Sequence, residues 1–385
     1  MNYQDMKKHL EGFGQQHLLE NWENLNGDEQ TALLTELTAI DFPLLAKLYK
    51  EYQAGEEESG EIAPIKTTKV SDLTTQVTAG EEVIANGQLA VVTLAGGMGS
   101  RLGHKGPKGS FVLPEPVNLS LFEILAGNIR RNAPQPPHWC IMTSYDNHED
   151  TLAFFEAKDY FGYERSKIHF FTQPRIPIME FCGKVALDEN GKIRMASNGN
   201  GAVFGTLKSS GLLTKLQEWG IKWVSVCGID NVLVNPVDPR FVGLAVAEGN
   251  IAAGKSITKR DPHERVGVFA MRGGVPSVVE YFELTDEMRH STSEDGEHLY
   301  SEGHILCNLY HTSLIEQAAS GAMSYHFNTS SGVIKSELLN CDVFAMVDSI
   351  SVLSVPREEE FSPLKSATGV DSVETATASV ANRKN

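Results

Sequence analysis

A glycine-rich, basic loop follows the apolar run 89-LAVVTL-94. The stretch 94-LAGGMGSRLGHKGPKGSF-111 contains six glycines together with Arg101, Lys105 and Lys108. Glycines let a backbone approach a ligand closely and adopt positive φ, and basic side chains bind anions. Because the chain has a formal net charge of −17, this local gathering of cations indicates a bound anion rather than a generally basic surface. The loop therefore predicts a phosphate-type site.

The spacing within the loop excludes the two commonest phosphate-binding loops. A Walker A loop requires a lysine directly after a glycine, whereas Lys108 follows Pro107. A dinucleotide fingerprint requires G-x-G-x-x-G, whereas Gly97, Gly99 and Gly103 are spaced with one residue too many. A plain strand–helix turn would not need so many glycines. The sequence favours a loop for a freer and more highly charged phosphate group.

The elements around the loop alternate between short apolar strands and helices. Strands are predicted at 89–95, 139–144, 168–173 and 222–230, and helices at 119–131, 148–157 and 204–220. Such alternation predicts an α/β fold with parallel strands and right-handed crossovers. Ligands bind beyond the carboxyl ends of such strands. The glycine loop, Gln173 and Asp230 all follow predicted strands, so we expect them at one edge of the sheet.

The remaining chain suggests three sequential regions. Residues 1–54 have helical periodicity, with Asp28 expected to cap a second helix, and 55–68 is an acidic, Gly/Pro-bearing linker. The predicted domains are an N-terminal helical region with its linker, a catalytic domain and a short C-terminal segment, which span 1–80, 81–350 and 351–385. Residues after Asp371 are expected to form a short helix or a disordered end.

Composition excludes several classes of protein. No apolar run approaches the ~18 residues that a membrane span needs, and the N-terminus shows no signal-peptide pattern, which predicts a cytoplasmic protein. The acidic net charge disfavours nucleic-acid binding. Five widely spaced cysteines without a C-x-x-C pair predict buried, reduced thiols rather than disulfides or zinc. Nothing in the composition implies a protein partner.

Five stretches resemble, in order, the motifs of one enzyme family. They are 94-LAGGMGSRLGHKGPKGSF-111, 195-MASNGNGAVFGTL-207, 226-VCGIDNVLVNPVDPRFVG-243, 278-VVEY-281 and 357-REEEFSPLKSA-367. On these motifs the chain is identified as a short, bacterial-type member of the UDP-N-acetylglucosamine and UDP-sugar pyrophosphorylases. The resemblance implies a Rossmann-like, GT-A-like nucleotidyltransferase fold with a mixed, mostly parallel sheet flanked by helices and an N-terminal helical segment.

The resemblance also implies an activity and a set of site residues. UTP and a sugar-1-phosphate, either an N-acetylhexosamine or a hexose, would give UDP-sugar and pyrophosphate by Mg²⁺-dependent in-line displacement, an EC 2.7.7 reaction. The implied roles are catalytic for Arg101, Lys108 and Lys365, nucleotide-binding for Ala95, Gly96, Gly97, Gln173, Gly199 and Asn200, sugar-binding for Glu280, Tyr281, Asn308 and Lys335, and metal-binding for Asp230.

Departures from the family pattern leave alternatives open. Leu339 and Cys341 stand where the N-acetylhexosamine enzymes carry aromatic residues around the acyl group, so the preferred sugar remains undecided. Asn308 lies one residue further from Gly303 than usual. Two other functions are considered: a non-catalytic sensor of UDP-sugars, and a nicotinamide-dependent oxidoreductase in which Asp146 would close on the ribose.

Overall fold

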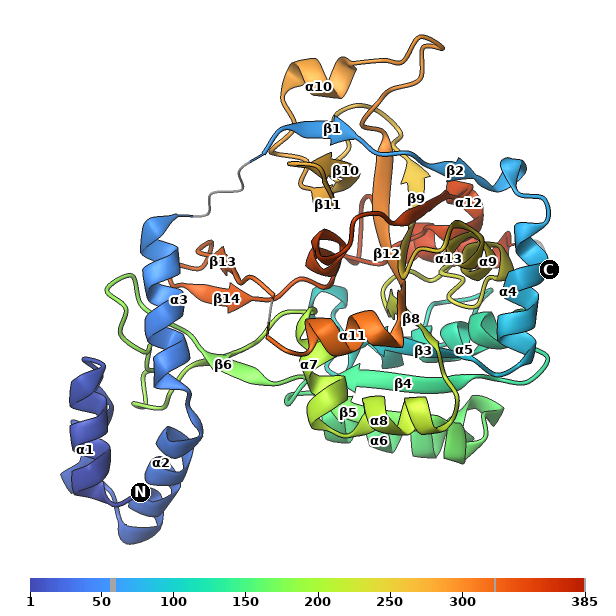
Figure 1. Cartoon of the computed structure of the whole chain (residues 1–385). Helices are drawn as coiled ribbons and strands as arrows, with labels where there is room; N and C mark the ends of the chain where they lie inside the picture. Colours follow the sequence, from blue (N-terminus) through green and yellow to red (C-terminus); the bar gives the residue numbers. More distant parts are fainter. Residues whose placement is uncertain (56–59, 322, 384–385) are drawn as a thin grey trace. The chain divides into compact units, whose positions relative to one another are not determined.

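The chain forms two compact units, each assembled from separate stretches of sequence. The computed structural model describes residues 1–55, 60–321 and 323–383, and Figure 1 shows their elements. The smaller unit consists of the described residues of Met1–Glu58, Pro174–Ala202 and Ser324–Leu339, and the larger unit of those of Ser59–Gln173, Val203–Met323 and Asn340–Asn385. These units do not follow the boundaries 1–80, 81–350 and 351–385, which remain a prediction about domains.

The larger unit is built on one mixed, mostly parallel sheet. Its strands in the described chain are β1 (Ile62–Pro64), β2 (Thr68–Lys69), β3 (Leu89–Leu94), β4 (His138–Thr143), β5 (Ile168–Thr172), β8 (Trp223–Gly228), β9 (Ala252–Thr258), β10 (Val268–Arg272), β11 (Val275–Val279), β12 (Glu302–His311) and β15 (Ser351–Ser354). The main order is β2-β15-β9-β12-β8-β3-β4-β5. Only β12 runs antiparallel to its neighbours β8 and β9 along this path. The predicted fold class is confirmed.

The register of β3 with its neighbours sets the position of the glycine loop. Leu94, the last residue of β3, pairs with Met142 of β4 and with Gly228 of β8, and Met142 pairs in turn with Phe171 of β5. The four parallel strands therefore end at the same level. The residues that follow them, including Gln173, meet along one edge of the sheet, as the sequence predicted.

Helices cover both faces of this sheet because its strands alternate apolar side chains between two cores. Val91 packs in one core and Val92 in the other. The first core is covered by α4 (Gln76–Ala85), α5 (Leu121–Arg131), α6 (His148–Ala157), α9 (Pro239–Glu248) and α13 (Val373–Ala381), and the second by α7 (Ala202–Ser209), α8 (Leu212–Glu218), α11 (Thr312–Ala318) and the 3-10 helix η8 (Asn340–Met346). The remaining helices of this unit are η3 (Val70–Asp72), η4 (Ser100–Leu102), η5 (Lys108–Ser110), η6 (Asp159–Gly162), η7 (Arg165–Lys167), α10 (Asp286–His290) and α12 (Arg357–Glu360).

The smaller unit packs the N-terminal helices onto two short β-hairpin-like pairs. Its elements are α1 (Tyr3–Gly12), η1 (Gln16–Leu19), η2 (Trp22–Asn24), α2 (Gly27–Ala39), α3 (Phe42–Ala54), β6 (Arg175–Pro177) with β7 (Met195–Ser197), and β13 (His326–Asn328) with β14 (Lys335–Glu337). One apolar core joins Leu10 and Leu48 of the helices to Met179 and Ile334. The N-terminal helices therefore share their core with two insertions that arrive more than a hundred residues later in the chain.

Several local predictions need correction. Asn26, not Asp28, caps α2, because its side chain accepts from the backbone of Asp28 and Glu29 in a capping box. The predicted helix 204–220 is two helices, since Gly211 adopts φ +73° between them. Residues 56–59 of the predicted linker lie outside the described residues, and the rest of it contains β1 and β2. The tail after Asp371 forms α13, one of its two predicted states.

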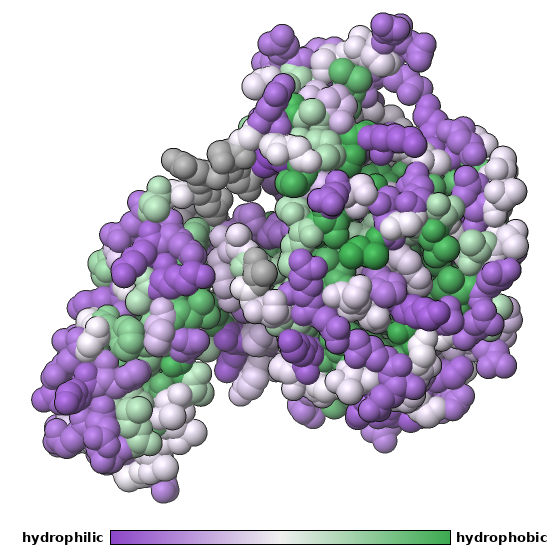
Figure 2. Space-filling view, viewed as in Figure 1, coloured by the Kyte–Doolittle hydropathy of each residue, from purple (hydrophilic) through white to green (hydrophobic). Residues whose placement is uncertain are grey.

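The exposed face is largely hydrophilic (Figure 2), and three of the five cysteines are buried. Hydrophilic residues cover most of the face drawn in Figure 2. Cys140, Cys227 and Cys307 are buried as predicted, and burial raises the pKa of the Cys227 thiol to about 12. Cys182 is exposed, contrary to that prediction. Among the described helices, none is both long and apolar enough to cross a membrane.

Candidate functional site

The glycine loop is folded into a closed ring by its own backbone. Met98 and Pro107 form an isolated β-bridge. The Lys108 N–H donates to the Gly97 carbonyl at 3.0 Å, and the Gly99 N–H donates to the Gly106 carbonyl, also at 3.0 Å. The ring fixes the backbone position of Lys108, because Lys108 is bonded to Gly97 on the opposite side of the ring. This arrangement suits an anion cradle made of backbone and basic side chains.

A buried asparagine ties this ring to the neighbouring strand. Asn147 is fully buried, and its amide donates to the carbonyls of Ala95 at 2.9 Å and Gly97 at 3.2 Å. Its side-chain oxygen accepts from the backbone of Ser144, which follows β4, at 2.8 Å. Two of the three predicted nucleotide-loop positions, Ala95 and Gly97, are thus bonded to a residue that the sequence analysis missed. An asparagine beside a histidine near a helix start carries no distinguishing local signal.

The glycine loop passes next to Gln173 at Gly96. A Cβ placed on Gly96 would lie 3.1 Å from Gln173 Oε1 and 3.4 Å from the Ser144 Cβ. A larger residue at Gly96 would require the Gln173 side chain to shift by a few tenths of an ångström, so the glycine lets the loop pass close to the end of β5. Gln173 is itself almost buried and is anchored by its backbone N–H to the Thr143 carbonyl at 2.8 Å. Its side-chain amide has the donor and acceptor that match a uracil edge.

Lys108 lies beside the carboxylate of Asp230 and near the charges of two further cations. Lys108 Nζ lies 3.8 Å from Asp230 Oδ2. The pKa of Lys108 is lowered, first by burial and also by the nearby charges of Arg101 and Lys365, while Asp230 opposes the shift. The structure thus brings together four residues that are spread over 265 positions of sequence, from 101 to 365. Arg101 lies on η4 and is exposed, and within the described chain no carboxylate lies at ion-pair distance from it.

The segment that carries Lys365 is bonded directly to the end of β8. The Leu364 N–H donates to the Asp230 carbonyl at 2.8 Å, and the Val232 N–H donates to the Ser362 carbonyl at 3.1 Å. Lys365 Nζ itself is half exposed and pairs with Asp371 Oδ2 at 3.1 Å. The predicted metal aspartate and the predicted catalytic lysine therefore belong to one bonded substructure.

The smaller unit holds the other predicted nucleotide positions and one lysine. Gly199 adopts φ +81°, and a Cβ there would lie 2.2 Å from the Leu338 carbonyl oxygen. The Gly201 N–H donates to that same carbonyl at 2.8 Å, and the Leu338 N–H donates to the Asn198 carbonyl at 3.0 Å. Asn200 lies in the loop between Asn198 and Gly201, which these two bonds hold to the backbone of Leu338. Lys335 begins β14, three residues before Leu338, so Gly199, Asn200 and Lys335 form one local group.

Glu280 and Tyr281 follow β11 in the larger unit. The Glu280 N–H donates to Glu283 Oε1 at 2.7 Å, and Glu283 forms an ion pair with Arg272 at 2.5 Å. The Tyr281 carbonyl accepts from Arg289 at 2.8 Å. These bonds fix the turn that presents the two predicted sugar-binding side chains. Phe282 beside them is 69% exposed, an unusual state for an aromatic ring.

Asn308 has a different environment from the one expected of a sugar contact. It is fully buried, accepts from His304 Nε2 at 2.9 Å and donates to Asn340 Oδ1 at 2.8 Å. The extra residue noticed in the sequence is a β-bulge, because the register of β12 shifts between His304 and Asn308 and Leu306 has φ +49°. His304 is in its neutral form, since burial lowers its pKa to about 4.

Asp230 offers a single carboxylate as a protein ligand for a metal ion. Among the described residues there is no group of three or more His, Cys, Asp or Glu side chains that could hold a metal ion. A single carboxylate with a partly exposed side chain is nevertheless the donor set used where substrate phosphates and water complete the coordination of a hard cation. The arrangement as a whole can position a polyphosphate between a glycine loop, three cations and one carboxylate.

Comparisons with known proteins identify the family of the chain. The family model of UTP–glucose-1-phosphate uridylyltransferase matches residues 42–383. A probable UDP-N-acetylglucosamine pyrophosphorylase of Dictyostelium discoideum is 29% identical over 99% of this chain and 88% of that protein. UDP-N-acetylglucosamine diphosphorylase 2 of Arabidopsis thaliana is 32% identical over 95% of this chain and 80% of that protein.

A solved structure is similar over almost the whole chain. The uridine diphosphate N-acetylglucosamine pyrophosphorylase from Trypanosoma brucei, crystallised in complex with an inhibitor, superposes with a TM-score of 0.83 at 28% identity, covering 98% of this chain and 84% of that one. These matches do not support the alternative of a nicotinamide-dependent oxidoreductase. The chain belongs to the UTP–glucose-1-phosphate uridylyltransferase family, and it is a uridylyltransferase of the kind that forms a UDP-sugar and pyrophosphate.

Proposed function

We propose that the substrates are UTP and a sugar-1-phosphate and that the glycine loop holds the triphosphate. The single observation that carries the proposal is the position of Lys108 at the carboxyl edge of the parallel strands, where its Nζ lies 3.8 Å from Asp230 Oδ2 and near the charges of Arg101 and Lys365. Arg101 offers two parallel N–H donors to the leaving pyrophosphate, and Lys108 adds a compact charge beside it. Charge that develops on the leaving group is stabilised where it forms.

The reaction is an in-line displacement without an enzyme-bound intermediate. An oxygen of the sugar-1-phosphate attacks the α-phosphorus of UTP, the bond from that phosphorus to the bridging oxygen breaks, and pyrophosphate leaves. The nucleophile is already an anion, so no general base is required. Catalysis then consists of positioning and charge neutralisation. Lys365, placed beside Asp230 by the bond from Leu364, would reduce the repulsion between the two phosphate groups.

Asp230 is the proposed ligand of a magnesium ion. Its lone carboxylate fits Mg²⁺, which keeps several waters and is completed by substrate phosphates. When bound, the ion would neutralise phosphate charge during the displacement. Lys108 Nζ lies 3.8 Å from Oδ2 of the same carboxylate.

The uracil and ribose contacts are proposed for Ala95, Gly96, Gly97 and Gln173 in the larger unit and for Gly199 and Asn200 in the smaller one. Close approach at Gly96 and the positive φ of Gly199 support these positions. Glu280, Tyr281 and Lys335 are the proposed sugar-side contacts. For Asn308, the bonds to His304 and Asn340 favour an indirect contribution, in which it fixes the start of η8.

The sugar is proposed to be an N-acetylhexosamine or a hexose. The similar proteins act, by their names, on UDP-N-acetylglucosamine, which favours N-acetylglucosamine-1-phosphate. Leu339 and Cys341 in place of aromatic residues instead favour a broader choice of sugar. Pyrophosphate release with UTP, Mg²⁺ and a panel of sugar-1-phosphates tests the proposal. A ranking among the sugars names the substrate. UDP-sugar binding without any pyrophosphate release would instead favour the non-catalytic sensor.

Two further expectations accompany this function. A cytoplasmic location stays a prediction. The partners are expected to be small molecules only: UTP, sugar-1-phosphate, UDP-sugar and pyrophosphate. Cell fractionation with an antibody to the chain would test the location.

A further inference from the structure

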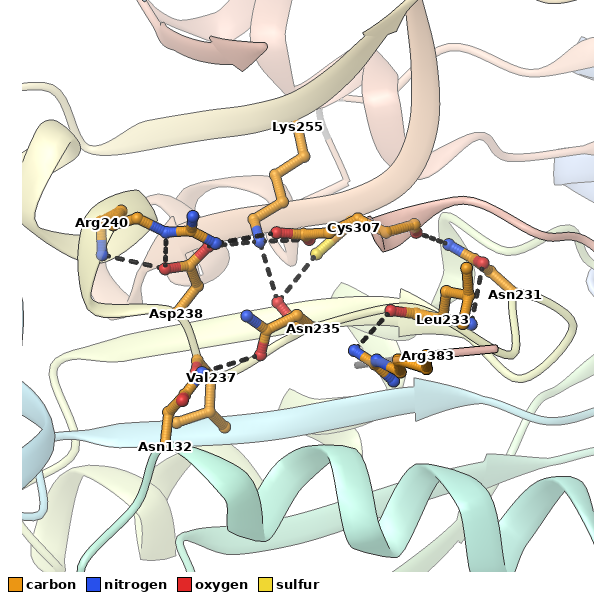
Figure 3. Close-up of polar contacts among 11 residues, drawn as sticks. Asn132, Asn231, Leu233, Asn235, Val237, Asp238, Arg240, Lys255, Cys307 and Arg383 are labelled. Atoms are coloured by element: carbon orange, nitrogen blue, oxygen red, sulfur yellow. Dashed lines mark hydrogen bonds and ion pairs between the residues drawn. The ribbon is translucent and has the colours of Figure 1, made fainter. Parts of the chain in front are cut away.

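A fully buried lysine lies in the middle of β9, and the proposed mechanism does not use it. The side chain of Lys255 has no solvent exposure, and its ammonium forms ion pairs with Asp238 at 2.7 Å and Glu360 at 2.5 Å. It also donates to the Asn235 carbonyl at 3.1 Å. Figure 3 shows Lys255 pointing toward Asp238 and Asn235. Such a charge is costly to bury and is retained only where it is paired and hydrogen-bonded.

The network around Lys255 is charge-balanced and joins distant parts of the sequence. Arg240 bonds both carboxylates, at 2.9 Å to Asp238 Oδ1 and at 3.2 Å to Glu360 Oε1. Two cations therefore face two anions. Burial opposes the charged state of Lys255, but its two carboxylate partners outweigh burial and raise its pKa. Burial raises the pKa of Glu360, while Lys255 opposes this shift.

Glu360 connects this network to the catalytic segment. Its backbone carbonyl accepts from the Asn231 amide at 2.7 Å, and Asn231 Oδ1 accepts from the Ser362 N–H at 2.9 Å. Asn231 follows Asp230, and Ser362 lies three residues before Lys365. The side chain of Glu360 is thus anchored in the interior while its backbone pairs with the residue next to the proposed metal ligand.

We propose that Lys255 is a positioning residue, which acts through Glu360 and Asp238 to hold the Lys365 segment in register with Asp230. The ammonium is a single point at which β9, the start of α9 and α12 are joined. A shift of α12 would move Ser362 and Leu364 along the end of β8 and carry Lys365 away from Asp230. This inference rests on the proposed role of Lys365, and its test separates the two.

The test uses the double variant Lys255→Met/Glu360→Gln, which we call the tether variant. It removes the ion pair between Lys255 and Glu360 while keeping the charges of the network balanced. Lys255→Met with Glu360→Gln leaves Asp238 paired with Arg240 and preserves side-chain volume. Lys255→Met alone leaves two carboxylates facing one arginine, so it is the harsher form and is not needed. Glu360→Gln alone is the milder form, and it carries the test if the double variant does not fold. The matched control is Lys259→Met, which removes a nearly buried lysine whose Nζ donates to the Pro262 carbonyl at 2.9 Å.

The expected result is a split between turnover and binding. For Lys255→Met/Glu360→Gln, kcat should fall by about 10-fold or more, as misplacement of a catalytic group does, while KM for UTP stays within about 3-fold of the unaltered protein. Glu360→Gln should show a smaller loss of kcat in the same direction. Lys259→Met should lower Tm without lowering kcat. A merely structural role of Lys255 would lower Tm and leave the kcat of the folded protein unchanged, which would overturn the proposal.

A double-mutant cycle with Lys365→Ala decides whether the effect passes through Lys365. If it does, adding Lys365→Ala to the tether variant gives the same kcat as Lys365→Ala alone. Multiplicative losses would show that the network acts elsewhere and would overturn the inference. A normal kcat for Lys365→Ala would instead refute the role proposed for Lys365. Hydrogen exchange gives an independent readout: the Ser362 and Leu364 amides should exchange faster in the tether variant, and unchanged protection would contradict the proposal.

Discussion

The two segments that would enclose the triphosphate are each held by a buried asparagine, but in contrasting surroundings. Asn147 ties the glycine ring to the end of β4 through neutral backbone groups only. Asn231 ties the Lys365 segment to the end of β8, and there the bonded backbone belongs to Glu360, whose side chain joins a buried ion network. One side of the site is thus positioned by local amide bonds and the other by charges from three distant parts of the sequence.

The contrast follows from how each segment enters the site. The glycine loop continues directly from β3, so one amide bonded to Ala95 and Gly97 is enough to set its course. The Lys365 segment comes from the end of the chain and has no strand to continue, since β15 ends at Ser354. A buried ion pair can fix such a segment, because moving one partner away would leave an uncompensated charge in the interior. We expect the two sides to respond differently to substitution.

The largest effect is expected for the exposed arginine of the glycine loop. Arg101→Ala should lower kcat by about 100-fold, because a charge contact to the leaving group is lost, with little change in Tm since the side chain is exposed. Lys105→Ala, in the same loop and also exposed, is the control and should stay within about 3-fold. Steady-state kinetics and thermal unfolding measure both. Unchanged turnover of Arg101→Ala would contradict its assignment to pyrophosphate.

The next effect concerns the charged side of the comparison. Asn231→Ala leaves the Glu360 carbonyl and the Ser362 N–H without a side-chain partner, which costs about 1–3 kcal/mol of folding stability. We expect kcat to fall by about 10-fold while KM for UTP changes little, because Lys365 and not the nucleotide loop is displaced. Asn86→Ala, at an exposed helix end, is the control. A rise in KM for UTP with normal kcat would show that the two sides are not separable.

The neutral side should give the opposite kinetic pattern. Asn147→Ala removes the bonds to Ala95, Gly97 and Ser144 and should raise KM for UTP by about 10-fold, with the smaller change in kcat. Isothermal titration with UTP measures the binding directly. If UTP affinity stays normal while the protein is destabilised, Asn147 supports only the fold, and the comparison between the two sides fails at this point.

The smallest effect is expected at the surface ion pair of the same segment. Asp371→Asn removes the pairing of Lys365 Nζ at 3.1 Å but keeps the backbone bond from the Lys365 N–H to the Asp371 carbonyl. Because Lys365 is about half exposed, we expect kcat within about 3-fold of the unaltered protein. The difference should shrink further in high salt. A loss as large as that of Asn231→Ala would mean that the exposed pair, and not the buried network, positions Lys365.

Much of the site was predictable because it depends on local patterns. Strands β3, β4, β5 and β8 and helices α5 and α6 follow from apolar periodicity, whereas the short pair β6 and β7 between them was not predicted. The parallel order of these four strands places the glycine loop, Gln173 and Asp230 at one edge. The predicted helix 148–157 matches α6 residue for residue. The roles proposed for the individual site residues remain predictions, since kinetics and not geometry decides them. The errors at Asp28 and Gly211 are local too. Asn26 is the N-cap of α2 instead of Asp28. Ser210 and Gly211 separate two helices, although the apolar spacing continues across them.

The sequence by itself determined the fold class, the family and the loop that would bind phosphate, because these depend on periodicity and on residues that are close together in the chain. Tertiary structure alone decided that Gly199 is stitched to Leu338, that a bulge turns Asn308 inward to His304, and that Lys255 is buried between Asp238 and Glu360. Each of these depends on pairing across many residues of chain. Such pairing leaves no periodic trace in the sequence, because a lysine or an asparagine looks the same there whether water or a buried carboxylate is its partner.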